Sequence, residues 1–191
     1  KNNGEYTESL LNHVKALGMF RKIDSRFNEY RILFVIADTY SKLGMYKETE
    51  RYLGDAKYLE TSFNDYYSLG RIFSISSEIN IWRGNMNAAK EDIEEAIDNF
   101  GASEQDSQLV FMMNRLAYLY LELGDNQQAA KVIRQSERIA EKNEDNDQIM
   151  RIEMLKELKQ VKLLLFLNMN LPKIFQRKIG LNMMQLKFGI H

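Results

Sequence analysis

Glycine recurs at a regular interval in this chain. Gly4, Gly44, Gly84 and Gly124 are evenly spaced in a sequence that has ten glycines among 191 residues. Such self-similarity is typical of repeat architectures, in which each repeat is one supersecondary unit stacked on its neighbours. Glycine is the usual residue where a helix ends with positive φ, so Gly44, Gly84 and Gly124 each predict a turn between two helices. The period therefore predicts an all-α chain of stacked helical hairpins.

Small residues recur at fixed offsets from these glycines. The positions seven before, five after and twelve after them hold only Ala, Ser or Thr: Ala37, Ser77, Ala117, Ser9, Thr49, Ala89, Ala129, Ala16, Ala56, Ala96 and Ser136. Small side chains let two helices approach closely, so these positions predict helix crossings. Apolar residues between them, such as Leu33, Leu53 and Ile93, follow helical spacing and predict the core. We expect helices near residues 6–20, 27–42, 46–60, 66–82, 86–99, 106–122, 126–142 and 146–166.

Two of the repeats resemble a known family. Segments 37–46 (ADTYSKLGMY) and 116–125 (LAYLYLELGD) share a small residue, a tyrosine three positions later and a Leu-Gly pair, and a small residue follows five positions after each glycine. This arrangement resembles the tetratricopeptide repeat. The copy around Gly84 is weaker, because Asn80 and Arg83 replace the tyrosine and the leucine. The resemblance covers about residues 4–158, and it implies a right-handed superhelix, an α-solenoid, of antiparallel helix hairpins.

The repeat departs from the family in two respects. It is six residues longer than the usual 34, and it lacks the proline that often closes the unit. We therefore expect longer helices or longer turns between hairpins.

The resemblance also implies a partner-binding face. In the family, the residues thirteen, ten, six and three positions before each glycine line a concave surface. The candidates for partner contact at these positions are Arg31, Phe34, Asp38, Arg71, Glu78, Phe111, Asn114 and Tyr118. Arginine would pair with a carboxylate of a peptide and Asn114 would hydrogen-bond its backbone. The alternative is that these are ordinary solvated residues on helices whose other face is the core.

The first repeat is predicted to be truncated. Gly4 occupies the position that ends the first helix of a hairpin, so the helix before it is missing, as expected for a piece of a longer protein or for a native cap. The apolar residues Leu10, Leu11, Val14 and Leu17 should then be partly exposed or covered by another molecule. Self-association through this end is the consequence.

A second boundary is predicted near Lys159. Residues 1–158 hold twenty Lys or Arg and twenty-seven Asp or Glu, whereas residues 159–191 hold six basic residues and no acidic one. The glycine that the period requires at Leu164 is absent. The tail has three interpretations: a cap packed on the last repeat, a basic amphipathic element for a partner or an anionic membrane, or a non-native end.

Signals of catalysis and of cofactors are absent from the sequence. There is no cysteine, phosphate loop, dinucleotide fingerprint or zinc spacing, and His13 stands where other repeats carry Leu or Ile. We expect no enzyme activity, cofactor or metal. The longest apolar run, residues 32–37, is too short to span a bilayer, and the net negative charge of residues 1–158 disfavours nucleic-acid binding. A cytoplasmic location fits the lack of cysteine.

Two classes of function follow. The first is a protein- or peptide-binding scaffold module of a larger regulatory protein. The alternative is a structural spacer or oligomerisation segment whose neighbours carry an enzymatic or DNA-binding activity.

Overall fold

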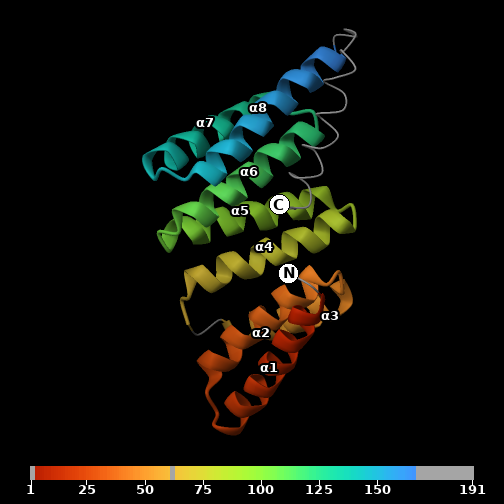
Figure 1. Ribbon diagram of the computed structural model, residues 1–191, viewed down its shortest axis with the longest axis vertical. Helices are drawn as coiled ribbons and strands as arrows, with labels where there is room; N and C mark the ends of the chain where they lie inside the picture. Colours follow the sequence, from red (N-terminus) through yellow and green to blue (C-terminus); the bar gives the residue numbers. More distant parts are fainter. Residues whose placement is uncertain (1–2, 61–62, 167–191) are drawn as a thin grey trace. The chain divides into compact units, whose positions relative to one another are not determined.

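The computed structural model describes residues 3–60 and 63–166 (Figure 1). Within these residues the chain forms eight α-helices and no strand. The helices are α1 (Asn3–Lys22), α2 (Arg26–Lys42), α3 (Tyr46–Glu60), α4 (Tyr66–Trp82), α5 (Met86–Ala102), α6 (Asp106–Glu122), α7 (Asn126–Lys142) and α8 (Asn146–Phe166). Helices α2 and α3, α4 and α5, and α6 and α7 pack against each other as consecutive pairs. The predicted all-α array of helical hairpins is confirmed.

The long repeat is explained by long helices. Helices α2 and α4 to α7 each have 17 residues, and each junction between α4 and α8 is a segment of three residues. From α2 onward the helices begin at equal intervals along the chain, at Arg26, Tyr46, Tyr66, Met86, Asp106, Asn126 and Asn146. Of the two outcomes expected from the sequence, longer helices or longer turns, the structure therefore shows the first.

Every junction contains a residue in the left-handed region of backbone conformation. Gly44, Gly84 and Gly124 have φ of 71°, 79° and 82°, as predicted for hairpin turns. The junctions between hairpins use non-glycine residues instead: Asp24, Asn64, Glu104 and Glu144, with φ between 48° and 55°. At Gly44 the amide of Met45 donates to the Tyr40 carbonyl at 2.9 Å, and the Gly44 amide donates to the Ser41 carbonyl at 2.9 Å. These two bonds satisfy carbonyls that the end of a helix leaves unpaired.

Gly4 does not form such a junction. Helix α1 begins at Asn3, so Gly4 lies inside its first turn. The helix expected near residues 6–20 therefore begins slightly earlier than predicted. Glycine permits a helical backbone as well as a turn, and Gly4 adopts the helical one.

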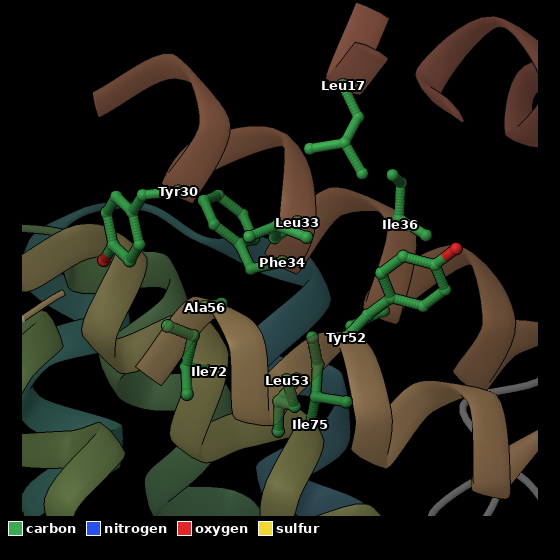
Figure 2. Packing of buried hydrophobic residues seen from close by; sticks show 11 residues of the cluster. Leu17, Tyr30, Leu33, Phe34, Ile36, Tyr52, Leu53, Ala56, Ile72 and Ile75 are labelled. Atoms are coloured by element: carbon green, nitrogen blue, oxygen red, sulfur yellow. The ribbon is translucent and has the colours of Figure 1, made fainter. Parts of the chain in front are cut away.

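The helices group into two compact units, residues up to Ser103 and residues from Glu104. In the first unit, α2 packs against α1, α3 and α4. Figure 2 shows the core that these four helices share. It includes Leu17, Tyr30, Leu33, Phe34, Ile36, Tyr52, Leu53, Ile72 and Ile75.

In the second unit, α6, α7 and α8 pack against one another. Their buried side chains include Met112, Leu121, Ile133, Ile152 and Leu155. Helix α8 continues without a break through residues 159–166, across the charge boundary seen in the sequence. Residues 167–191 of the predicted tail lie outside the described residues.

The small residues mark tight helix crossings. Nine of the eleven predicted positions have no exposed surface: Ala37, Thr49, Ala56, Ser77, Ala89, Ala96, Ala117, Ala129 and Ser136. The other two, Ser9 and Ala16, are half-buried on α1. Because protein interiors are close-packed, larger side chains at the nine buried positions would push the helices apart.

Candidate functional site

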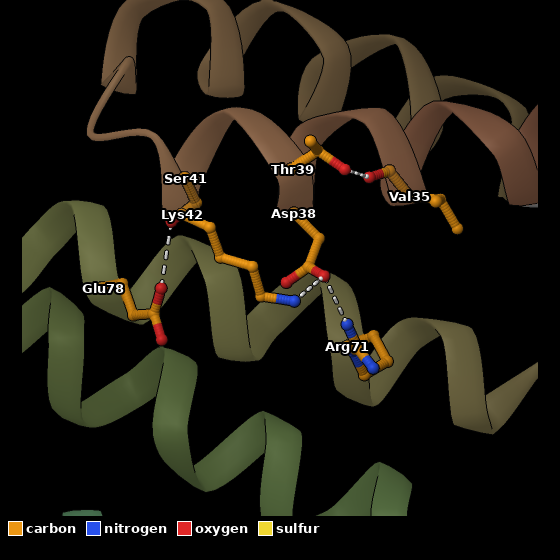
Figure 3. A network of polar contacts seen from close by, with 7 residues as sticks. All are labelled: Val35, Asp38, Thr39, Ser41, Lys42, Arg71 and Glu78. Atoms are coloured by element: carbon orange, nitrogen blue, oxygen red, sulfur yellow. Dashed lines mark hydrogen bonds and ion pairs between the residues drawn. The ribbon is translucent and has the colours of Figure 1, made fainter. Parts of the chain in front are cut away.

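Asp38 on α2 lies between two cations of the first unit (Figure 3). Its Oδ2 atom is 2.9 Å from an Nη2 of Arg71 on α4 and 2.6 Å from Nζ of Lys42, one turn along α2. Arg71 was predicted to pair with a carboxylate of a partner. In the structure Arg71 already pairs with a carboxylate of its own chain, because the packing of α2 against α4 brings Asp38 and Arg71 together.

A second polar contact joins the same two helices. The hydroxyl of Ser41 donates to Glu78 Oε2 at 3.0 Å (Figure 3). Asp38, Ser41, Lys42, Arg71 and Glu78 together form what we call the α2–α4 polar strip. Lys42 is the exposed member of the strip, and exposed ion pairs contribute only about 0–1 kcal/mol to stability, so the Lys42–Asp38 pair can exchange partners at low cost.

Arg31 lies on the strip's side of α2. It is two turns before Asp38, and a separation of seven residues returns to nearly the same face of a helix. Its guanidinium carbon is 5.8 Å from the centroid of the exposed Phe27 ring. Among the described residues no carboxylate lies within ion-pair distance of Arg31, which is exposed to solvent.

Phe34 is not part of any surface. Its side chain is 4% exposed, and its ring centroid is 6.2 Å from that of Tyr30 in the core. The physical reason is that α2 packs against three helices, so the buried arc is wide enough to include this position. Phe34 therefore stabilises the first unit and is not available to a partner.

Two arginines lie close to the ring of Phe111 in the second unit. The guanidinium carbons of Arg115 and Arg151, on α6 and α8, are 5.9 and 5.7 Å from the ring centroid. Cation–π contacts of this kind contribute about 0.5–1 kcal/mol at exposed sites. Phe111, a predicted contact residue, thus lies beside Arg115 and Arg151, which are not among the predicted contact residues.

Asn114 is buried and already bonded. Its amide Nδ2 donates to Gln148 Oε1 at 3.1 Å, and both side chains are buried. Its Oδ1 is buried with no hydrogen-bond partner among the described residues. The predicted bond from Asn114 to a bound peptide is therefore not available in this conformation.

Tyr118 lies in a polar chain that ends on α8. Burial, and then the charge and hydrogen bond of Glu122, raise the pKa of Tyr118 to about 12. Lys162 of α8 donates to Glu122 Oε1 at 2.8 Å and to the Leu121 carbonyl at 2.9 Å. This contact ties the end of α6 to α8.

The sequence contained signals for part of this polar structure. Lys42 follows Asp38, and Glu122 follows Tyr118, by four residues, a spacing at which helical side chains meet. No local signal identifies Gln148 or Lys162, because each meets its partner across a long stretch of sequence. The five predicted residues on α2 and α4 belong to the first unit and the three on α6 to the second.

The exposed apolar residues of α1 form another candidate surface. Leu11 and Val14 are 55% and 40% exposed, and Met19 is 66% exposed. Leu17 was expected at this surface but is 4% exposed, and Leu10 packs on the core, because α2 covers that side of α1. The expected apolar face is therefore split into a buried half and an exposed half.

The described part of the chain offers no metal centre. It contains no cluster of three or more His, Asp or Glu side chains that could hold a metal ion. Over the same residues, no helix combines the length and the apolar character needed to cross a membrane.

Comparison with protein families identifies one repeat directly. Residues 112–143, which cover most of α6 and all of α7, match the family model of the tetratricopeptide repeat. This segment is a tetratricopeptide repeat. No curated protein matches the chain. The tetratricopeptide repeats are generally non-catalytic and commonly mediate protein interactions, and this one supplies Asn114 and Tyr118 of the predicted site.

Proposed function

We propose that the chain is a scaffold module that binds a protein or peptide through the first-helix faces of its hairpins. The observation that carries this proposal is Arg31, an exposed guanidinium without a carboxylate partner among the described residues, on the same side of α2 as the α2–α4 polar strip. The tetratricopeptide repeat at residues 112–143 supports a role in protein interaction.

The chemistry of the strip favours a partner segment with acidic side chains. Arg31 offers a bidentate donor to a carboxylate. Lys42 and Arg71 share Asp38, so a second carboxylate from the partner would complete a four-membered network. In the second unit, Phe111 with its two arginines offers an aromatic and cationic contact. Phe34 and Asn114 are excluded from this role by their burial.

The proposal is tested by charge reversal at Arg31 and Arg71. Immobilised wild-type chain and the R31E/R71E variant are compared for the proteins they capture from the source organism, with quantitative mass spectrometry as readout. We expect at least tenfold lower recovery of specific partners with the variant. The matched control is E91R/E95R, which reverses two charges on α5, where both side chains are exposed. Circular dichroism checks that helicity is unchanged, and recovery by R31E/R71E equal to that of wild type would refute the proposal.

A second function is self-association through α1. The observation that favours it is the exposure of Leu11, Val14 and Met19, because the positions equivalent to Leu11 and Val14 on α5 and α7 carry charges: Glu91, Glu94, Lys131 and Arg134. In this alternative the chain is a structural spacer or oligomerisation segment. Sedimentation equilibrium of wild type and L11D/V14D decides the question: a wild-type oligomer that the variant abolishes supports self-association, and a monomer in both excludes it.

We further propose that the module works in the cytoplasm as part of a regulatory protein, without catalytic activity, cofactor, or nucleic-acid binding by its repeats. The lack of cysteine and the acidic balance of residues 1–158 support this.

A further inference from the structure

The first unit has a hollow between α3 and α4. Its volume is about 200 Å³, and it is lined by Glu50, Leu53, Gly54, Lys57, Ser76, Ile79 and Asn80. Leu53 and Ile79 are each 4% exposed and form an apolar floor. The rim is polar. These residues are separate from the α2–α4 polar strip.

The hollow exists because two positions that are long elsewhere are short here. The residues two repeats later in the sequence, at the positions equivalent to Gly54 and Ser76, are Arg134 and Lys156 of the second unit. There, Lys156 forms an ion pair with Glu137, the counterpart of Lys57. The α7–α8 groove is thus bridged by charges, and the α3–α4 groove is not. Around Gly54, no heavy atom would lie within 4 Å of an added Cβ.

The charge of Lys57 is not balanced within the hollow. Its Nζ lies 4.9 Å from the Phe73 ring centroid, and no carboxylate among the residues that line the hollow is within ion-pair distance of it. Glu50 does not balance it, because its carboxylate is held by Arg83, with an Nη2 to Oε2 distance of 2.7 Å. The amide of Asn80 donates to Asp92 at 2.7 Å, which leaves its carbonyl oxygen for other donors. The hollow therefore combines an apolar floor with one cation.

We propose that this hollow receives a glutamate side chain of a partner protein. Its volume lies below the range of about 300–1,000 Å³ for small-molecule pockets and suits a single side chain. The methylene groups of glutamate would cover Leu53 and Ile79, and its carboxylate would pair with Lys57, the role that Lys156 and Glu137 play for each other in the second unit. Gly54 leaves room for the partner backbone to approach α3. This site does not depend on the proposed scaffold face.

The test uses a short peptide as probe. Binding of acetyl-Leu-Glu-Leu-amide to the ¹⁵N-labelled chain is followed by nuclear magnetic resonance, with acetyl-Leu-Gln-Leu-amide as the neutral comparison. We expect saturable shifts of the Gly54 and Ser76 amides with the glutamate peptide and at least tenfold weaker binding of the glutamine peptide. The variant K57M should remove this preference.

Filling the hollow should abolish binding. G54R places an arginine where the second unit has Arg134, and K57E/S76K rebuilds the Glu137–Lys156 pair. Both variants should bind the glutamate peptide at least tenfold more weakly than wild type does. The matched control is G18R on α1, another helical glycine with no atom within 4 Å of an added Cβ. It should bind like wild type.

The outcomes separate this site from the proposed scaffold face. Peptide-induced shifts at Ser76 that survive G54R, or a glutamate preference that survives K57M, would overturn the proposal. Absence of shifts in the hollow would also overturn it. R31E/R71E should leave the peptide affinity unchanged, so a loss of affinity in that variant assigns the peptide to the α2–α4 polar strip instead.

Discussion

The ring of Phe100 lies directly against the backbone of Gly70. A Cβ atom added to Gly70 would be 2.8 Å from both Cδ1 and Cε1 of that ring, which is 2% exposed. The contact joins α4 to α5. One repeat later, Val110 and Ala140 stand at the equivalent positions. There the larger residue is on the first helix and the smaller one on the second, so the order of sizes is reversed between the two repeats.

The Gly70–Phe100 contact predicts a strong packing effect that a second substitution partly reverses. Gly70→Ala should lower the free energy of unfolding by about 1–3 kcal/mol, because the added methyl group overpacks the ring. Phe100→Ala should cost about 3–5 kcal/mol through the cavity it leaves. The double variant G70A/F100A should cost clearly less than the two single changes together, because the methyl group then enters the vacated space. Urea denaturation measures all four proteins, and strict additivity would contradict the contact.

Replacing a glycine by alanine should raise stability inside a helix and lower it in a turn. Gly54 and Gly84 both have open space around an added Cβ, but only Gly84 has positive φ, at 79°. Gly54→Ala should raise stability by about 1 kcal/mol through helix propensity. Gly84→Ala should lower it by about 1–2 kcal/mol, because an L-residue is strained there. Thermal or urea denaturation measures the stability of both variants. Stability changes of the same sign would contradict the left-handed conformation assigned to Gly84.

The non-glycine junctions offer the converse substitution. Glu144 adopts φ of 54°, a region that glycine enters without steric cost. Glu144→Gly should therefore raise the free energy of unfolding by about 0.5–1 kcal/mol. Glu141→Gly, in the helical last turn of α7, is the matched control and should lower it. A loss of stability in E144G larger than in E141G would contradict the assigned conformation.

Removing one member of the buried Asn114–Gln148 pair should destabilise the fold more than replacing both members by apolar residues. Gln148→Ala leaves the Asn114 amide without its acceptor, so it should cost about 1–3 kcal/mol beyond the loss of packing. Replacing both residues by leucine should be nearly neutral, since no buried polar group then remains. Urea denaturation followed by circular dichroism measures the difference. If N114L/Q148L is as unstable as Q148A, the amide bond is not the cause.

The phenol of Tyr118 should ionise at a higher pH than that of an ordinary tyrosine. Because burial and Glu122 raise its pKa to about 12 from 10.0, folding favours the neutral phenol. The resulting stabilisation is fully present below the unfolded-state pKa of 10.0 and is lost as the pH rises through the folded-state pKa of about 12. Carbon-13 resonances of the tyrosine rings, assigned with Y118F, report this pKa. Glu122→Gln should lower it only in part, because burial, the larger cause, remains.

Helix boundaries and the buried small residues were largely predictable from the sequence, whereas the burial of Phe34 and Asn114 was not. The turns at Gly44, Gly84 and Gly124 have a local cause, the positive φ that glycine accepts, and the small residues around them mark crossings that depend only on offset. The equivalent turns at Asp24 and Glu144 carry no glycine, so the sequence did not reveal that every junction is alike. Helix α1 begins slightly before its predicted start, because glycine accepts a helical backbone as well as a turn, and Gly4 has the helical one.

The candidate site was predicted less well for a related reason. The offsets correctly place Asp38 and Arg71 on adjacent first helices, but an offset does not say how wide a buried arc will be. Phe34 and Asn114 fall inside that arc. The partners of Arg71, Asn114 and Tyr118 depend on which helices meet, and this is decided by packing across distant parts of the sequence.

The uniform junctions have a consequence for how such a chain can change length. Since the helices from α2 onward begin at equal intervals and each described junction has a residue in the left-handed region, a tandem duplication of any segment one repeat long joins its ends in the middle of a helix or a turn that already fits. The breakpoint of the duplication need not coincide with a boundary between hairpins. Genes encoding such chains can therefore gain or lose whole hairpins by recombination at arbitrary positions, while an insertion of half a repeat would exchange the roles of the two helices in every later hairpin.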